Sequence, residues 1–340
     1  MLASTLSPLA ASQNQNYSIT DLGSLDPGGI VDVSYSSGIN NFGQVVGSSY
    51  TALSLHAYLW TKQAGIQDLG TLGGSNSLAS AINDFGTVAG QSDLADGTQH
   101  AFTWTKSGGM HDLGTLGGSD SAAFGINQAG QVVGEAFLSD GTEHAFLWTA
   151  AGGMQDLGIL GGDTSTAYAI NNSSEIVGSS SIAGNGDIHA FLWTKTKGMQ
   201  DLGTIKSYNP SYAFAINDFG QIVGYAGITQ AFTVTYGFVR NPGQKLKGIG
   251  FLEGGTQTFP YGINSLGEIV GTFNAASGVG GAFRWTAAQG MQDLNLLLPP
   301  NSGWMLNQGN AINNVRQIVG SGPVLINGNY TNHAFLLSPR

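Results

Sequence analysis

The 340-residue chain contains no cysteine. This absence excludes disulfide bonds, thiolate metal sites and a cysteine nucleophile. It does not identify the compartment, because exported bacterial proteins and cytosolic proteins can both lack cysteine.

Charged residues are also scarce, at 9% of the chain, and 11 Lys plus Arg stand against 21 Asp plus Glu, for a formal net charge of −10. So few basic residues cannot form the surface that binds a phosphate backbone, and we expect no nucleic-acid partner. Anionic membranes are disfavoured for the same reason. No apolar run reaches the length of a transmembrane helix, so we expect no membrane insertion.

Glycine, in contrast, is abundant, with 53 residues, and 41% of the chain is hydrophobic. The hydrophobic content excludes intrinsic disorder. Many glycines with few charges indicate short strands joined by tight turns rather than helices with charged outer faces. The composition therefore predicts an all-β protein.

Seven similar segments of the chain can be aligned on an Ile-Asn dipeptide, and the aligned copies are 43 to 49 residues apart. The asparagines are Asn40, Asn83, Asn127, Asn171, Asn217, Asn264 and Asn313, and we number the repeats one to seven after them. A glycine follows each asparagine seven positions later: Gly47, Gly90, Gly134, Gly178, Gly224, Gly271 and Gly320. One structural unit is therefore used seven times.

Each copy contains four segments with the pattern of a strand, as residues 123–162 illustrate. The I-N-x-x-G segment predicts a hairpin turn between two strands, since Asn and Gly tolerate the positive φ of such turns. H-A-F-L-W-T then predicts a third strand, and M-Q-D-L-G a fourth. Four antiparallel strands in about 44 residues match one blade of a β-propeller.

The two ends of the chain predict how the array closes. The seventh copy stops after its third strand, at NHAFLLSPR, whereas residues 17–25, YSITDLGSL, are a fourth strand with nothing before it. A ring in which the N-terminal strand completes the last blade leaves no exposed edge. We therefore predict one domain, residues 17–340, folded as a seven-bladed β-propeller of four-stranded antiparallel blades closed in this way. For residues 1–16 we expect a flexible N-terminus or the remnant of an export signal.

The repeated HAFLW and DLGTLGG elements resemble the HAF-repeat family, which is named for its His-Ala-Phe tripeptide and found in bacterial proteins regarded as extracellular. The resemblance covers about residues 17–340. It implies export and a propeller-like repeat. It implies no activity and assigns no catalytic residue.

The repeated histidines, aspartates and tryptophans are interpreted as architecture, because ring symmetry spreads equivalent residues around the molecule. We expect the histidines to hydrogen-bond within their blades, the aspartates to bond a turn or face water, and the tryptophans to pack between blades. No cofactor or metal site is predicted. Asp96-Gly97 and Asp140-Gly141 resemble fragments of calcium loops but lack the required spacing, so calcium remains an option without motif support.

Candidate ligand-binding residues lie where the repeats differ. Aromatic residues occur in the segments that enter the first strand of several repeats: Tyr35, Tyr208, Tyr212, Phe259, Tyr261 and Trp304. An exposed crescent of such rings suits stacking on sugars. The alternative is that these rings fill the central channel or the core between blades.

The first functional hypothesis is a secreted or cell-surface monomer that binds a polysaccharide or another cell-surface polymer. The alternative is a polysaccharide lyase or glycoside hydrolase, which needs an acid/base pair near the channel mouth, with Asp32, Asp163 and Glu253 as candidate carboxylates. A third hypothesis is a structural or protein-interaction scaffold. Fold alone does not decide among them.

Overall fold

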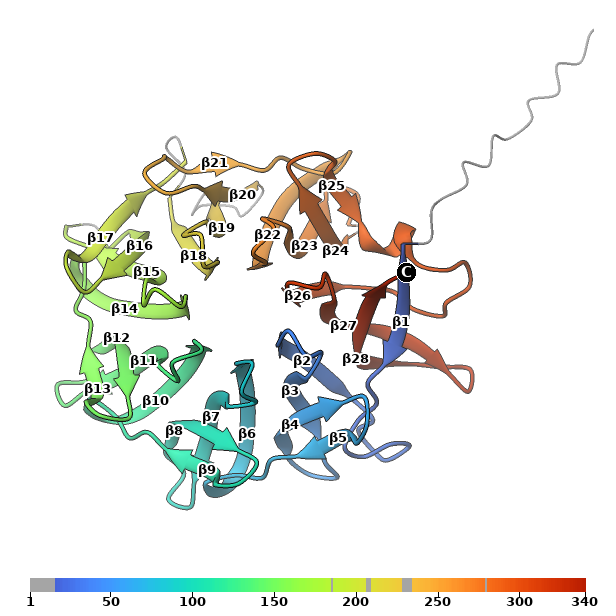
Figure 1. Cartoon of the computed structure of the whole chain (residues 1–340), viewed down its shortest axis with the longest axis horizontal. Coiled ribbons are helices and arrows are strands. Elements are labelled where there is room, and N and C mark those ends of the chain that lie inside the picture. Colours follow the sequence, from blue (N-terminus) through green and yellow to red (C-terminus); the bar gives the residue numbers. More distant parts are fainter. Residues whose placement is uncertain (1–15, 185, 206–208, 228–233, 279) are drawn as a thin grey trace, which may run out of the picture.

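The computed structural model describes residues 16–184, 186–205, 209–227, 234–278 and 280–340. Nearly all regular structure there is antiparallel β-strand, and the described part has one short 3-10 helix, η1 (Leu294–Leu297). Figure 1 shows the sheets arranged around a central axis, with one strand of each sheet nearest that axis. The chain is therefore all-β, as its composition predicts.

The sheets follow one another along the chain, and each begins at the axis. The first sheet contains β2 (Ser34–Ile39), β3 (Val45–Tyr50), β4 (Leu55–Thr61) and β5 (Gly65–Asp68), and the second contains β6 (Gly73–Ile82), β7 (Val88–Leu94), β8 (Gln99–Thr105) and β9 (Gly109–Asp112). The third sheet contains β10 (Gly117–Ile126), β11 (Val132–Leu138), β12 (Glu143–Thr149) and β13 (Gly153–Asp156). The fourth contains β14 (Gly161–Ile170), β15 (Ile176–Ile182), β16 (Ile188–Thr194) and β17 (Gly198–Gly203). Each of these is a four-stranded antiparallel sheet.

The fifth and sixth repeats are joined in one hydrogen-bonded network. They contain β18 (Ser211–Ile216), β19 (Ile222–Gly227), β20 (Thr235–Arg240), β21 (Lys247–Gly248), β22 (Gly255–Ile263), β23 (Ile269–Ala275), β24 (Gly280–Thr286) and β25 (Gly290–Asp293). The link is a single parallel pair, Thr235 with Gln257, between β20 and β22. Apart from that pair, each repeat keeps its own antiparallel order.

The last sheet combines both ends of the described chain. It contains β26 (Gln308–Ile312), β27 (Ile318–Ile326), β28 (Asn329–Pro339) and β1 (Tyr17–Asp21), and β1 pairs with β28 from Tyr17 opposite Pro339 to Asp21 opposite Phe335. Figure 1 shows the blue strand β1 beside the dark red strand β28. The strand that the seventh repeat lacks in sequence is thus present in its sheet.

The repeated asparagines build the inner hairpin turns. The side-chain oxygen of Asn40 accepts hydrogen bonds from the backbone N–H groups of Phe42 and Gln44, which fixes the turn, and Gly43 takes a φ of 73° there. The same side chain donates to the backbone oxygen of the next repeat's asparagine, Asn83, at 3.0 Å. This bond recurs from repeat to repeat, and Asn313 donates to the oxygen of Asn40 at 2.9 Å.

The glycine seven positions after each asparagine is required by lack of space. A Cβ atom at Gly134 would lie 1.8 Å from the backbone oxygen of Ala122 on the neighbouring strand. Equivalent distances in the other repeats are similarly short, for example 1.9 Å between a Cβ at Gly47 and the oxygen of Tyr35. The two innermost strands of each sheet therefore approach too closely for any side chain at this position.

The repeated histidines and tryptophans have the structural roles expected from the sequence. In the second repeat, His100 Nδ1 lies 2.8 Å from an oxygen of Asp112, and the same carboxylate accepts a bond from the N–H of Gly114 in the following turn. Trp148 packs against a buried cluster that contains residues of both the second and the third repeat. These predictions are confirmed, and the hydrophobic core lies between adjacent sheets.

Candidate functional site

The innermost strands enclose two cavities that lie one above the other along the central axis. We call the seven repeated asparagines the ring asparagines. The isoleucine directly before each of them lines both cavities, except Ile216, which lines only one. One cavity lies on the side of the hairpin turns, and the other is lined by the residues that come before each isoleucine. The isoleucine layer therefore separates two chemically different spaces.

The cavity at the turns is polar and has a volume of about 320 Å³. Its lining consists of the ring asparagines, the isoleucines and the residues that follow the asparagines. Many of those polar groups are already bonded to one another. Asn41, for example, donates to Asp84, and Asp84 in turn donates its N–H to Gln128. The hydrogen bonds between neighbouring repeats thus account for much of the polarity of this end.

The second cavity, of about 220 Å³, has two different sides. The residue three positions before each ring asparagine lines it, and these residues are Ser37, Ser80, Phe124, Tyr168, Phe214, Tyr261 and Asn310. Repeats three to six therefore supply four aromatic rings, whereas repeats seven, one and two supply polar side chains. An aromatic wall facing a polar wall is suited to a ligand with both apolar faces and hydroxyl groups.

The aromatic wall continues into a larger cluster of rings. The Tyr168 and Phe214 centroids are 4.8 Å apart, and Phe214 contacts Tyr261 edge-on at 5.8 Å. Tyr212 and Tyr225 both stack on Phe214 and are tilted against each other, and Phe259 meets Tyr225 edge-on at 5.1 Å. The structure thus brings together three of the six predicted aromatic residues, Tyr212, Phe259 and Tyr261, through rings that the sequence analysis did not select.

The missed rings follow a signal that is visible in the sequence. Phe124, Tyr168 and Phe214 occupy the same repeat position as Tyr261, three residues before an asparagine. Alternation along an extended strand places this position on the same side as the one two residues earlier, where Tyr212 and Phe259 lie. Aligning this position across the repeats would have found the aromatic wall.

Burial affects the phenol groups of the cluster. It raises the pKa values of Tyr168, Tyr212, Tyr225 and Tyr261 above the ordinary value, and neighbouring tyrosines add to the effect on Tyr225. All four phenols are neutral at pH 7, as ordinary tyrosines are, and Tyr168 and Tyr261, which line the cavity, can donate a hydrogen bond to a ligand oxygen.

A pair of glutamates lies beside this cluster. The hydroxyl of Thr166 lies between Glu135 on β11 and Glu143 on β12, at 2.9 Å from an oxygen of Glu135 and 3.5 Å from an oxygen of Glu143. Burial first, and then the charge of Glu143, raise the pKa of Glu135 to about 7. The charge of Glu135 also raises the pKa of Tyr168, which connects the pair to the aromatic wall. With a pKa of about 7, Glu135 is partly protonated at neutral pH.

The three predicted carboxylates are not brought together. Asp32 precedes β2, Asp163 lies on β14, and Glu253 lies in an exposed turn before β22, so they belong to different repeats. The cavities described above are not lined by any of these three residues. The backbone N–H of Asp163 bonds the Ser181 hydroxyl at 2.8 Å.

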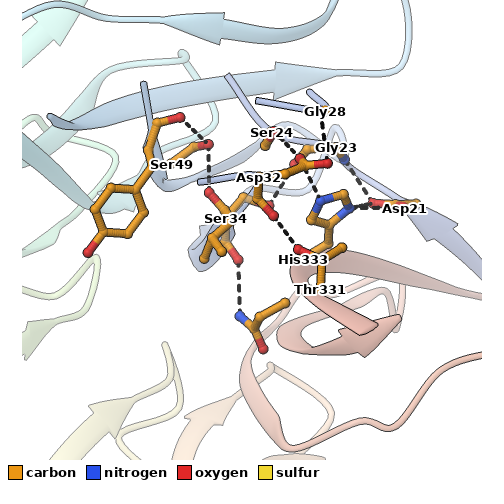
Figure 2. Close-up of polar contacts among 12 residues, drawn as sticks. Asp21, Gly23, Ser24, Gly28, Asp32, Ser34, Ser49, Thr331 and His333 are labelled. Atoms are coloured by element: carbon orange, nitrogen blue, oxygen red, sulfur yellow. Dashed lines mark hydrogen bonds and ion pairs between the residues drawn. The ribbon is translucent and has the colours of Figure 1, made fainter. Parts of the chain in front are cut away.

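Asp32 instead connects the two ends of the described chain. Its carboxylate accepts bonds from the Ser24 hydroxyl at 2.5 Å and the Gly28 N–H at 3.0 Å, and it lies 3.0 Å from His333 Nε2. The other ring nitrogen of His333 is 2.8 Å from Asp21 on β1. Figure 2 shows His333 between the two carboxylates, with Thr331 donating to the backbone oxygen of Asp32.

Charge stabilises this arrangement. Burial alone would lower the pKa of His333, but hydrogen bonds and charges from Asp21 and Asp32 outweigh burial and raise it. Burial likewise opposes ionisation of Asp32, yet its bonds to Ser24, Gly28 and His333 lower the pKa of that carboxyl. Because both ring nitrogens of His333 have carboxylate partners, this histidine is poorly placed to act as a general base.

The remaining predicted aromatics have separate positions. Tyr35 is 40% exposed on β2. Trp304 packs against the buried cluster around β28 and meets Phe335 edge-on at 5.8 Å, which is a core contact. Tyr208 lies outside the described residues.

Neither a metal centre nor a membrane-spanning helix is found in the described ranges. They contain no group of three or more histidine and carboxylate side chains placed to hold a metal ion. Within the same ranges, no helix has both the length and the apolar character needed to cross a bilayer.

No protein-family model and no curated protein sequence matches the chain. Among solved structures, the β-propeller domain of the trilobed protease from Pyrococcus furiosus, described as having an open velcro topology, is similar over 90% of this chain and 97% of that one, with a TM-score of 0.58 at 10% identity. The BP39L lectin from Burkholderia pseudomallei is similar over 96% of each chain, with a TM-score of 0.53 at 9% identity. These likenesses show the fold, and the protein is a β-propeller.

Proposed function

We propose that this β-propeller is a binding module that holds one sugar unit of a polysaccharide or another cell-surface polymer in its central cavity. The observation that carries the proposal is the two-sided lining, with Phe124, Tyr168, Phe214 and Tyr261 facing Ser37, Ser80 and Asn310. Sugar rings have apolar C–H faces that stack on aromatic rings and hydroxyls that bond polar groups. One of the proteins with a similar structure is a lectin, which is consistent with the proposal.

The size of the cavity limits what enters it. Its volume of about 220 Å³ is smaller than the roughly 300 Å³ at which pockets for drug-sized ligands begin. We therefore propose that a terminal or branching sugar unit enters while the rest of the polymer remains outside. A ligand held in this way needs no charge, which fits a wall of two phenylalanines and two neutral tyrosines.

For the fold, we propose that residues 17–340 form a single propeller of seven blades in which β1 completes the last blade. The pairing of β1 with β28 and the asparagine bonds that run from repeat to repeat support this count. We also propose that the chain is a monomeric, exported member of the HAF-repeat family; the repeated HAFLW and DLGTLGG segments support it.

Glycan binding tests the functional proposal. We expect the protein to be retained on a panel of immobilised polysaccharides or to bind their oligosaccharides, with no release of product. Replacing the aromatic wall, in the double variant Phe214→Ser and Tyr261→Ser, removes stacking worth about 0.5 to 1.5 kcal/mol per ring and is expected to weaken binding by about tenfold or more. Calorimetry or glycan-array titration gives the affinity.

The chain itself supplies the controls for this test. Serine already occupies the same position in repeats one and two, so the substitutions are compatible with the fold. Tyr330→Ala, which removes a 63% exposed aromatic ring elsewhere, is expected to leave binding unchanged. Equal affinity for the double variant and the original protein would contradict the proposal.

The hydrolase alternative has less support from the geometry. Glycosidases hold their two carboxyl groups at least about 5 Å apart. Asp32, Asp163 and Glu253 belong to different repeats and line neither cavity, so they do not form such a pair there. Release of reducing ends from any polysaccharide in the panel would favour the enzymatic alternative.

A further inference from the structure

Large apolar side chains are exposed at one end of the molecule, on the tips of the inner hairpin turns. Each lies two residues after a ring asparagine: Phe42, Phe85, Phe219, Leu266 and Val315, with exposed fractions of 76%, 80%, 67%, 57% and 56%. They belong to repeats one, two, five, six and seven, which the asparagine bonds connect in the order five, six, seven, one, two. We call these five residues the apolar crescent.

Exposed basic residues gather at the same end. Val45 at the start of β3 pairs with Trp60 near the end of β4, so the turn between β4 and β5 lies beside the inner hairpin turn. All exposed lysines and arginines of the described chain are at, or next to, turns at this end: Lys62, Lys106, Lys195, Lys197, Lys245, Lys247, Arg316 and Arg340. We call them the basic rim, and they surround the apolar crescent.

Nine carboxylates lie in loops and at strand ends of the opposite end. The loops and strand ends there carry Asp26, Asp32, Asp93, Asp96, Asp120, Asp140, Asp163, Asp187 and Glu253. The described carboxylates beside the crescent are Asp84, Asp218, Glu175 and Glu268, and each is hydrogen-bonded to a neighbouring side chain. The net charge of −10 is therefore an average over one acidic and one basic end.

Apolar and basic groups meet directly at one place. Phe42 and Lys62, together with Gly43, Gln44, Thr61 and Gln63, line a surface hollow of about 300 Å³. This hollow places the cation of Lys62 beside the exposed ring of Phe42. An anionic lipid requires this combination, because its headgroup is attracted to a cation and its acyl chain to an apolar group.

We propose that this end of the propeller docks on an anionic lipid bilayer, with the apolar crescent in the interface and the basic rim on the headgroups. The net charge of the whole protein disfavours binding to an anionic membrane. Electrostatic attraction to the membrane, however, acts over roughly a Debye length of 8 Å, so it depends on the charge of the end that faces the membrane. The crescent tips stand separately around a polar cavity, so they form no continuous groove for a protein segment. A fluid interface accommodates each tip individually.

Flotation with lipid vesicles tests the proposal. The protein is expected to float with vesicles of phosphatidylcholine and phosphatidylglycerol and to remain unbound with phosphatidylcholine alone. The variant Phe42→Ala, Phe85→Ala and Phe219→Ala is expected to lose at least about tenfold in binding. Each of Lys62→Ala and Lys106→Ala is expected to lose roughly fivefold, since one basic residue near an anionic surface contributes about that factor.

Matched variants separate this effect from misfolding and from the sugar site. Repeat three has Ala129 at the crescent position, so alanine there is compatible with the turn. Leu53→Ala, which alters a 95% exposed residue between β3 and β4 at the acidic end, and the cavity variant Phe214→Ser are both expected to float normally. Absence of flotation, or flotation that the triple variant leaves unchanged, would overturn the proposal. Salt-sensitive self-association without vesicles, basic end to acidic end, would also overturn it.

Discussion

At the scale of single residues, the position three before each ring asparagine determines the character of the central cavity. The backbone there is nearly the same in all repeats, because the asparagine fixes the turn and the glycine fixes the distance between the two strands. The side chain is consequently free to differ, and it is aromatic in four repeats and polar in three. Repeat architecture and binding chemistry thus reside in neighbouring but separate positions.

Glu135 provides a residue-scale prediction that depends on pH. Its pKa is raised from 4.5 to about 7 in the folded protein, so the native state holds this proton more tightly than the unfolded chain does. The free energy of unfolding should therefore decrease as pH rises from 4.5 to about 7, by about 3 kcal/mol at most from this group. In Glu135→Gln the thermal midpoint should depend less on pH across this range.

The exposed Glu253 is the matched control for that measurement. Glu253→Gln is expected to preserve the pH dependence of the original protein. If Glu135→Gln and Glu253→Gln have the same profile, Glu135 is not the source of the pH dependence.

At the scale of the elements, the close approach of the two inner strands predicts which glycines cannot change. A Cβ at Gly134 would lie 1.8 Å from the oxygen of Ala122, so Gly134→Ala must push β10 and β11 apart. We expect a loss of about 3 kcal/mol or more in the free energy of unfolding, measured by denaturant titration.

A second glycine in a strand supplies the comparison. The nearest atom to a Cβ at the exposed Gly248 on β21 is 3.9 Å away, and Gly248→Ala should change stability by less than about 0.5 kcal/mol. Similar losses in the two variants would show that steric exclusion is not the reason for the repeated glycine.

The sequence allowed the strands and the inner hairpins to be predicted, because strand patterns and the I-N-x-x-G turn depend on local preferences. The bonds between ring asparagines were not predicted. Six of them join residues 43 to 49 positions apart and one joins Asn313 to Asn40, so each requires the relative placement of two sheets. Glu135 and Glu143 become neighbours only through the pairing of β11 with β12. The carboxylates selected from the sequence, such as Asp32, proved to have partners that no local pattern reveals.

At the scale of the whole molecule, strand β1 carries the proposed closure. It contributes the buried Tyr17, and the buried Leu22 follows it, each 3% exposed. Deleting residues 17–25 removes both, together with the bond between Asp21 and His333, and should lower the thermal midpoint by about 10 °C or more. An unchanged midpoint would contradict closure by this strand.

Complementation distinguishes loss of the strand from general damage. A synthetic peptide of residues 16–25, added to the truncated protein, should pair with β28 and restore much of the midpoint. A peptide in which Tyr17 and Leu22 are replaced by serine should restore less, because it lacks the two side chains that enter the core.

The bond from the N–H of Arg340 to the backbone oxygen of Asn16, at 3.0 Å, places the two ends of the described chain side by side. The order of the repeats around the axis is consequently independent of where the polypeptide is cut. A circular permutant that joins these ends and opens another exposed turn between sheets would retain the cavity lining, the apolar crescent and the basic rim. The place of a repeat around the axis therefore does not depend on how far that repeat lies from either end of the chain.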